Sequence, residues 1–243
     1  MYRFFTLLLL FFSLSASSQH IERANFLYKS KFYDIISFNV DSSFVSSISI
    51  VENNSLIPEN LYFDSLSQYG KFFAITAGSV DSLCNLLGFY SLNGFVKQKL
   101  NLGTGVGNFY SFGNSVLVMS KSDAHFISTG NFLPSVKYDF ALQSGPILVE
   151  SGKINSAFSS SSQNKFIRCG VGVSRSSTKV QMHFVLSNEP VTFYQISDLF
   201  VNKLKCTDAF LLESSFSASA HFPNSKKVHS PVRSVCKYIY VRL

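Results

Sequence analysis

The strongest constraint on the fold is a succession of short apolar runs, rich in Phe, Ile and Val, that Asn, Gly and Ser turns separate. Residues 31–51 alternate loosely and predict two antiparallel strands, and residues 72–75 predict a buried strand. Residues 88–127 contain several short strands, while residues 166–173 and 180–186 predict a hairpin. Because strands outnumber helices and occur in succession, we expect an α+β single domain with a mixed, mostly antiparallel sheet and a few short helices.

Two segments carry helix signals. Residues 58–70 begin with a proline, end with a glycine and place three large side chains on one face, the last of them Tyr69. The second signal is a capping box, with Thr192 as the N-cap and Gln195 three positions later. An apolar face continues from there along residues 193–205. We expect this second helix to deliver the chain to the apolar strand that follows it.

The first 19 residues have the layout of a secretory signal. Arg3 gives a positive start, residues 4–14 are apolar, and residues 15–17 are small enough for a cleavage site. The apolar stretch is shorter than the roughly 20 residues that span a bilayer. We therefore expect a cleaved signal over residues 1–19, no stable membrane insertion afterwards, and a periplasmic or secreted domain over residues 20–243.

Composition narrows the class of protein. The chain has 243 residues, of which 46% are hydrophobic and 26 are Phe, so most of it can bury a core. Its net charge of +7 is modest, and Lys226-Lys227 is the only adjacent basic pair. Nucleic-acid-binding proteins more often cluster their Lys and Arg on one face. We therefore expect no nucleic-acid partner.

Four cysteines remain in the exported chain, namely Cys84, Cys169, Cys206 and Cys236. An oxidising compartment permits disulfides, and four cysteines allow three pairings. One bridge with two free buried thiols and two bridges are both compatible with their wide spacing. No CxxC pair and no histidine with metal-ligand spacing accompanies them, so we expect no metal and no cofactor.

Three segments could carry chemistry. The stretch GTGVGN, residues 103–108, lacks dinucleotide-loop spacing and predicts a glycine turn that presents Asn108. Arg168 lies inside an apolar strand and is either a paired core charge or an anion clamp. Glu213 ends an apolar run and precedes small hydroxyl residues, so it is either an exposed strand end or a carboxylate facing a pocket.

Several motifs, taken in order, give the chain a likeness to a known family. They are Thr76-Ala77-Gly78, Gly88-Phe89-Tyr90, Gly107-Asn108-Phe109-Tyr110, Gln143-Ser144-Gly145-Pro146, Arg168-Cys169-Gly170-Val171-Gly172, Glu189-Pro190-Val191-Thr192-Phe193 and Leu212-Glu213-Ser214. In this order they resemble the phosphodiester glycosidase domain family, in particular its short exported bacterial branch. The similarity covers residues 33–223, most of the mature chain.

The resemblance implies a set of site residues at converging strand ends. Arg168 would hold the phosphate of a sugar phosphodiester, and Glu213 would act as the acid or base. The resemblance adds substrate-binding positions at Thr76, Asn108, Ser144, Gly145, Cys169 and Ser217. Four positions in three motifs depart from the family pattern, which has Asn at Thr76, Asn at Cys169 and Asp-Gly at Glu213-Ser214.

The departures bear on activity, because a carboxylate displaced by about 1 Å can cost roughly 100-fold in rate. The resemblance therefore implies an exported protein that hydrolyses a sugar-1-phosphodiester, with weakened catalysis. The alternative is a catalytically silent protein that binds envelope glycans in the same cleft. A third possibility is an unrelated structural protein of the cell envelope. In the first two cases the partner is a glycan or a sugar phosphate.

Overall fold

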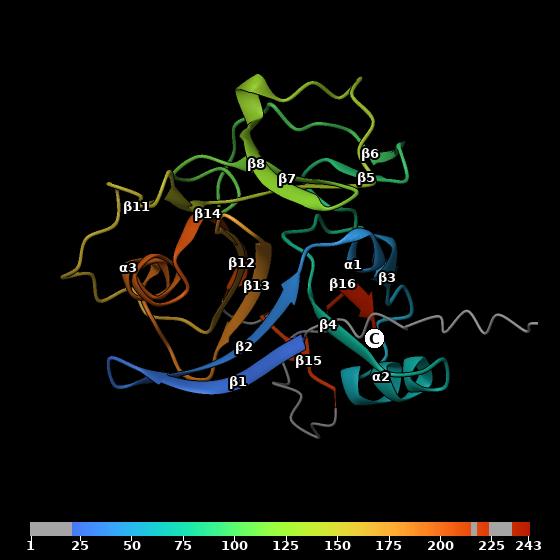
Figure 1. The fold of residues 1–243 in the computed structure, drawn as a ribbon, viewed down its shortest axis with the longest axis horizontal. Helices are drawn as coiled ribbons and strands as arrows, with labels where there is room; N and C mark the ends of the chain where they lie inside the picture. The colour runs from blue at the N-terminus through green and yellow to red at the C-terminus, as the bar shows by residue number, and fades with distance from the viewer. Residues whose placement is uncertain (1–20, 215–217, 224–234) are drawn as a thin grey trace, which may run out of the picture.

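The computed structural model describes residues 21–214, 218–223 and 235–243. The predicted signal and Ser217 lie outside these residues. Three sheets make up most of the described fold, and every strand pairing within them is antiparallel (Figure 1). The prediction of a mostly antiparallel β architecture with few short helices is confirmed, although the fold has three sheets where the sequence predicted one.

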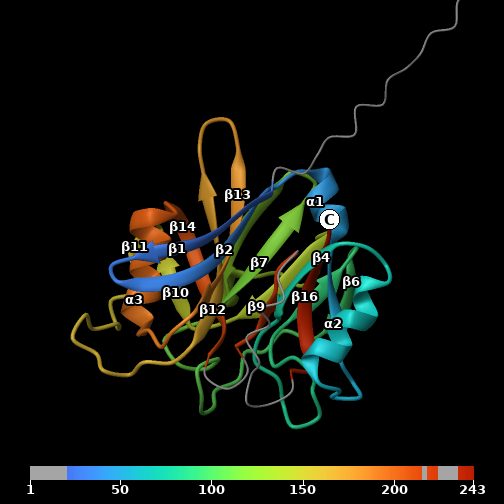
Figure 2. The same ribbon diagram turned by 90° about the horizontal axis from the view of Figure 1, so that it is seen from below.

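The largest sheet has seven strands, in the order β1-β2-β13-β12-β14-β10-β11. The strands are β1 (Ile21–Tyr28), β2 (Lys31–Asn39), β13 (Val180–Ser187), β12 (Arg168–Arg175), β14 (Cys206–Ser214), β10 (Ile147–Glu150) and β11 (Lys153–Ile154). The predicted β12–β13 hairpin is confirmed, and it projects at the top of Figure 2. Strand β14 lies between β12 and β10, which places its last residues beside the start of β12.

The second sheet has four strands, in the order β15-β4-β16-β3. The strands are β15 (Ala220–His221), β4 (Phe72–Thr76), β16 (Lys237–Arg242) and β3 (Ile48–Glu52). The third sheet has five strands, in the order β6-β5-β9-β7-β8. The strands are β6 (Phe95–Gln98), β5 (Tyr90–Leu92), β9 (Phe140–Ser144), β7 (Ser115–Ser120) and β8 (Asp123–Ser128).

Short helices flank the sheets. They are α1 (Ser42–Ser47), α2 (Glu59–Ser67), a 3₁₀ turn (Thr129–Asn131), α3 (Phe193–Asp198) and a π-helical turn (Leu199–Lys203). The capping box is confirmed, because Thr192 Oγ1 accepts from Gln195 N and Gln195 Oε1 accepts from Thr192 N. Helix α3 lies against the outer face of the seven-stranded sheet, and α2 lies beside β4 (Figure 1).

Two local predictions are wrong. Residues 42–47, expected within a strand, form α1, because the Asp41 side chain accepts a hydrogen bond from Phe44 N and starts a helical turn. Tyr69 was expected on the buried face of the helix after Pro58. The helix ends at Ser67, so the Tyr69 side chain points to solvent with 78% exposure.

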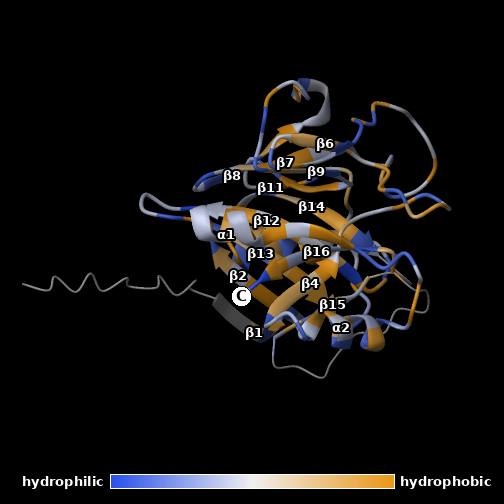
Figure 3. Cartoon of the chain, turned by 90° about the vertical axis from the view of Figure 1, so that its right-hand side faces the viewer, coloured by the Kyte–Doolittle hydropathy of each residue, from blue (hydrophilic) through white to orange (hydrophobic). Residues whose placement is uncertain are grey.

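All three sheets contribute to one hydrophobic core. Phe38 of β2, Ile75 of β4, Leu117 of β7, Val171 of β12 and Ile239 of β16 are fully buried in it. Figure 3 shows strands such as β4 and β14 coloured mainly as hydrophobic. Because the strand ends surround this shared core, residues far apart in sequence meet at its rim.

Of the two cysteine arrangements compatible with the sequence, the structure has one disulfide and two free buried thiols. Cys84 and Cys236 form a disulfide across a sequence separation of 152 residues, and Cys169 and Cys206 are free and buried. His183, one of the five histidines, is also buried. Its ring nitrogens lie 2.7 Å from Ser37 Oγ and 2.8 Å from Ser174 Oγ, and burial lowers its pKa to about 4. It is therefore a neutral core histidine at physiological pH.

Candidate functional site at the end of strands β12 and β14

The pairing of β12 with β14 determines on which face of the sheet the side chains of Arg168 and Glu213 lie. In the β12–β14 ladder Arg168 lies opposite Ser214, and Cys169 lies opposite Glu213. The register shifts just after these pairs, so Leu212 is an extra residue in β14. Neighbouring residues of a strand point to opposite faces. The side chains of Arg168 and Cys169 therefore leave β12 on different sides.

Glu213 occupies a low-dielectric position at the end of β14. It is partly buried, and Oε1 accepts a hydrogen bond of 2.8 Å from Ser214 N. Burial raises the pKa of the carboxyl to about 7, because the ionised form loses hydration that one backbone donor does not replace. A carboxyl with such a pKa is partly protonated near neutral pH and can donate a proton.

Cys169 lies beside Glu213 and is fully buried. Burial raises the pKa of its thiol, and the charge of Glu213 raises it further. The thiol is therefore neutral and offers only weak hydrogen bonding, unlike an amide at this position. Ser219 N also lies near the thiol, and it donates to Thr76 Oγ1 over 3.1 Å. Thr76, Cys169 and Glu213 are thus neighbours.

Asn108 and Ser144 come from earlier parts of the chain, and both form hydrogen bonds with β14. Asn108 Nδ2 donates to Ser214 Oγ over 2.7 Å, and Ser144 Oγ donates to the Leu211 carbonyl over 2.7 Å. Gly78 has a positive φ of 137°, and a Cβ at this position would lie 3.5 Å from Ser144 Oγ. Three separate motifs therefore meet around the last four residues of β14.

Arg168 is buried to 1% exposure and turns away from Glu213. Its Nε donates to the Val191 carbonyl over 2.8 Å, and an Nη donates to the Asn164 carbonyl over 3.1 Å. The guanidinium carbon lies 3.7 Å from the centroid of the Phe193 ring, a cation–π contact. Burial lowers its pKa to about 10, so it stays charged at neutral pH. Within the described residues, no ion pair joins it to Glu213.

Two further predicted positions have different surroundings. A Cβ on Gly145 would lie 2.8 Å from Asn114 Cβ and 2.8 Å from the Gly113 carbonyl, so glycine is required there by packing. Ser217 lies outside the described residues. Ser214 does not occur among the residues with positive φ, so a serine in place of the family's glycine carries no backbone strain at this position.

A buried carboxylate that sequence reasoning missed lies next to this group. Glu59, the first residue of α2, is 6% exposed and accepts hydrogen bonds from Tyr238 Oη and from Ser219 Oγ, the latter over 2.9 Å. Burial raises its pKa to about 7. Because Ser219 also bonds Thr76, the chain of contacts runs from Glu59 to the candidate site. The sequence offered only an acidic residue after a proline, a common pattern at helix starts.

A family model for phosphodiester glycosidases matches residues 67–241. The chain belongs to the phosphodiester glycosidase family. YigE, an uncharacterised protein of Escherichia coli strain K12, is 31% identical to it over 157 residues. That alignment covers 65% of this chain and 61% of the relative. The resemblance found in the sequence motifs is therefore confirmed at the level of the family.

Two solved structures share the fold of this phosphodiester glycosidase family member. The catalytic domain of zebrafish N-acetylglucosamine-1-phosphodiester α-N-acetylglucosaminidase, auto-inhibited by its pro-peptide, has a TM-score of 0.58 at 13% identity, covering 93% of this chain and 83% of the other. A hypothetical protein from Synechocystis has a TM-score of 0.53 at 14% identity, covering 91% of this chain and 61% of the other.

The described residues contain no group of three or more His, Cys, Asp or Glu side chains gathered so as to hold a metal ion. Across the same ranges, no helix has both the length and the apolarity needed to cross a membrane.

Proposed function

We propose that this protein is an exported phosphodiester glycosidase that acts slowly on a sugar-1-phosphodiester, with Glu213 as its acid. Family membership supports the reaction class. The observation that carries the assignment of the acid is the Glu213 carboxyl, whose pKa is raised to about 7 where three motifs meet. Partial burial leaves this carboxyl in reach of a ligand at the strand end. It would protonate the oxygen that leaves when the bond to the sugar breaks.

The surroundings of Glu213 support slow catalysis. Thr76 and Cys169 stand where the family pattern has amides, and Thr76 Oγ1 is already bonded to the Ser219 backbone. The neutral, buried Cys169 thiol replaces a strong donor and acceptor with a weak one. Arg168 directs two of its donors to main-chain carbonyls, which leaves fewer for a phosphate. Each of these features removes a polar contact that a substrate could use.

Export rests on two observations. Residues 1–19 have the charge and apolarity of a secretory signal, and the Cys84–Cys236 bond is of a kind that persists in oxidising compartments. Mass spectrometry of protein recovered from the cell envelope should find an N-terminus near Ser18. A mature protein that keeps Met1 and stays in the cytosol would contradict export.

The activity proposal is tested by restoring the family pattern. We expect the combined substitution Thr76→Asn, Cys169→Asn, Glu213→Asp and Ser214→Gly to raise hydrolysis of a chromogenic sugar-1-phosphodiester at least about 100-fold. Single substitutions should do less, because residues that act as a unit are non-additive. The control is Cys206→Ser, which changes a buried free thiol away from the site. Rapid turnover by the unaltered protein would show that catalysis is not weakened.

A silent glycan-binding protein is the second candidate, and Arg168 favours it. Its guanidinium is stacked on Phe193 and bonded to two carbonyls, so its position does not depend on a bound phosphate. Calorimetry with a glycosyl phosphodiester distinguishes the two candidates. Binding without turnover, even in the fourfold variant, would identify the silent protein. If Arg168 still contacts the ligand, Arg168→Ala should weaken binding about tenfold, equivalent to 1.4 kcal/mol.

A further inference from the structure

A cavity lies away from the candidate site, between the edge of the four-stranded sheet and strands β5 and β6. Its volume is about 360 Å³, at the small end of the roughly 300–1,000 Å³ typical of ligand pockets. Residues of β3, β16, β5 and β6 line it, together with Asn85 and Leu86 from the loop that follows Cys84. None of the residues assigned above to the candidate site contributes to this lining.

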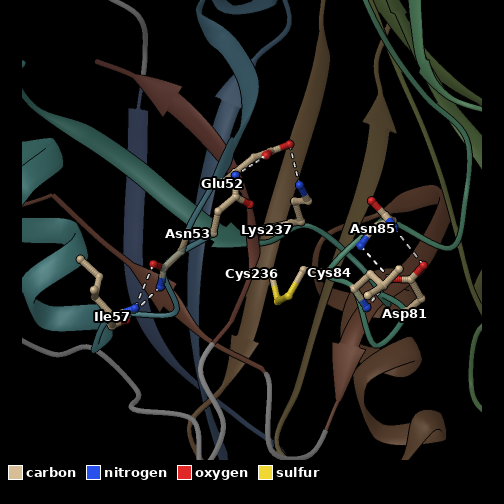
Figure 4. The surroundings of a disulfide bond; sticks show 10 residues. Glu52, Asn53, Ile57, Asp81, Cys84, Asn85, Cys236 and Lys237 are labelled. Carbon is tan, nitrogen blue, oxygen red and sulfur yellow. Dashed lines mark hydrogen bonds and ion pairs between the residues drawn. A yellow bond between two sulfur atoms is a disulfide. The ribbon is translucent and has the colours of Figure 1, made fainter.

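The charges around the cavity leave one cation available. Lys237 is 9% exposed and lies 2.5 Å from Glu52, so these two charges are paired (Figure 4). Asp81, nearby, accepts hydrogen bonds from Asn85 and from the Leu83 backbone. Lys97 lines the cavity, is exposed, and makes no ion pair with any described residue. The lining therefore carries an excess positive charge at Lys97.

A buried hydroxyl at the cavity wall has an unused proton. Tyr90 is 8% exposed, and its hydroxyl oxygen accepts a hydrogen bond of 3.2 Å from Ile50 N. Within the described ranges, the Tyr90 hydroxyl accepts this bond and donates none. Because Tyr90 lines the cavity, this proton is available to an acceptor atom of a ligand that enters it.

The remaining wall is apolar. Leu86 is 6% exposed, Leu92 is partly buried, and Ile50 packs against the central core. Such a wall binds the hydrocarbon part of a small molecule by removing its surface from water. The cavity therefore combines a cation, a free hydroxyl donor and an apolar side within one small volume.

We propose that this cavity binds a small organic anion, with a carboxylate or phosphate directed to Lys97 and Tyr90 and a compact apolar body against Leu86 and Leu92. The proposal goes beyond the glycosidase function and does not depend on Glu213 or Arg168. An anion accepts from both donors and offsets the charge of Lys97. The size of the cavity limits the ligand to about one ring or its equivalent.

The disulfide keeps the two sides of this site together. Cys84 immediately precedes Asn85 and Leu86 on one wall, and Cys236 immediately precedes Lys237 on the other (Figure 4). The bond therefore joins the loop that contributes Leu86 to the strand that contributes Lys237. A site whose walls are fixed before binding loses less conformational freedom when the ligand enters.

Methyl-labelled full-length protein provides the test. We expect benzoate and phenyl phosphate to shift the methyl resonances of Ile50, Leu86 and Leu92, while benzyl alcohol, with the same ring and no charge, binds at least about tenfold more weakly. Comparison of benzoate with phenyl phosphate shows which anionic group the site prefers. Inorganic phosphate, which lacks the apolar body, should also bind at least about tenfold more weakly.

Paired lysine variants locate the contact. Lys97→Gln should weaken benzoate binding at least about tenfold, whereas Lys99→Gln, an exposed lysine outside the lining, should leave it unchanged. The proposal is overturned if neither aromatic anion moves the three methyl resonances. It is also overturned if benzyl alcohol or inorganic phosphate binds as tightly as benzoate, or if the two lysine variants behave alike.

Discussion

Glu59 and Glu213 are two carboxylates whose pKa burial raises to about the same value, about 7, in surroundings that differ. Glu59 accepts from Tyr238 Oη and Ser219 Oγ, two side chains that hold both of its oxygens in place. Glu213 accepts from the backbone N–H of the next residue, through one oxygen. The first carboxyl is enclosed at the start of a helix, and the second ends a strand with some exposure.

A raised pKa alone therefore does not identify a reactive group. Both carboxyls are protonated to a similar extent near neutral pH, yet only Glu213 keeps an oxygen that no described side chain holds. A carboxyl held by two donors stabilises the fold, because each donor would otherwise be buried without a partner. A carboxyl held by one backbone donor can exchange a proton with a ligand. The predictions below separate these two roles.

The largest expected effect is on catalysis. In the fourfold variant that restores the family pattern, using Glu213→Gln in place of Glu213→Asp should lower the rate at least about 100-fold, because Gln cannot donate the proton. Adding Glu59→Gln to the fourfold variant should change the rate less than about threefold. Initial rates with a chromogenic sugar-1-phosphodiester measure both. Glu150→Gln, on the exposed end of the neighbouring β10, is the matched control.

The opposite ranking of the two variants would reverse the assigned roles. If Glu59→Gln abolished turnover while Glu213→Gln left it intact, Glu59 would be the reactive carboxyl and the assignment at β14 would be wrong. Far-ultraviolet circular dichroism of each variant must match that of the parent protein before rates are compared.

The next effect is on stability. Glu59→Ala should lower the free energy of unfolding by about 2–6 kcal/mol, because Tyr238 and Ser219 both lose a buried acceptor, each at about 1–3 kcal/mol. Glu213→Ala should cost less than about 1 kcal/mol, since it leaves one backbone donor at a partly exposed position. Urea denaturation measures both. Equal losses would show that the two carboxyls are held equally.

Stability should also change with pH in a defined window. An unfolded glutamate ionises near pH 4.5, while both folded carboxyls stay protonated until about pH 7, so the free energy of unfolding falls as pH rises between these values. Glu59 contributes at most about 1.4 kcal/mol per pH unit, and Glu213 less because of its exposure. His183, with its pKa lowered to about 4, opposes this trend.

The measurement is therefore a difference between variants. Glu59→Gln should flatten the fall in melting temperature between pH 5 and 7 more than Glu213→Gln does. Thermal unfolding at half-unit pH steps would reveal it. A parallel set of curves for the parent and both variants would mean that neither carboxyl has a raised pKa.

The smallest effect concerns the link between the two regions. Ser219→Ala removes one of the two side-chain donors to Glu59 and should cost about 1 kcal/mol, while Tyr238 still holds the carboxyl. Ser177→Ala, in the exposed turn of the β12–β13 hairpin, should be neutral. If Ser219→Ala also lowered turnover in the fourfold variant more than tenfold, the two regions would be coupled through Thr76.

Much of the fold could be predicted from local patterns. The buried strand predicted at residues 72–75, the β12–β13 hairpin and the capping box at Thr192 each depend on neighbouring residues, and each is confirmed. The apolar content of residues 42–47 resembles that of the strands around them and predicts a strand. The hydrogen bond from Phe44 N to the Asp41 side chain starts a helical turn there instead. In the sequence, one possible N-cap residue is a weaker signal than a strand-like apolar pattern.

The candidate site was predicted less completely. Sequence order brought Asn108, Ser144 and Glu213 together as motifs, and the structure shows their contacts with β14. The sequence could not show that the Arg168 side chain turns to Val191 and away from Glu213. The extra residue in β14 shifts the strand register, and the register determines which β14 residue lies opposite Arg168. Glu59 had no motif at all. Its partners Ser219 and Tyr238 are about 160 residues or more away, so only the fold reveals the contact.

Strand β16 has a consequence for the order of events during synthesis. It lies between β3 and β4 and pairs with both, although these two strands emerge from the ribosome far earlier. Neither can complete its hydrogen-bond ladder until β16 has been made, and the Cys84–Cys236 bond must wait for the same segment. Long-range pairing of this kind is slow to form. The chain would thus remain unfolded in this region during translation, which is the state that a translocation channel accepts.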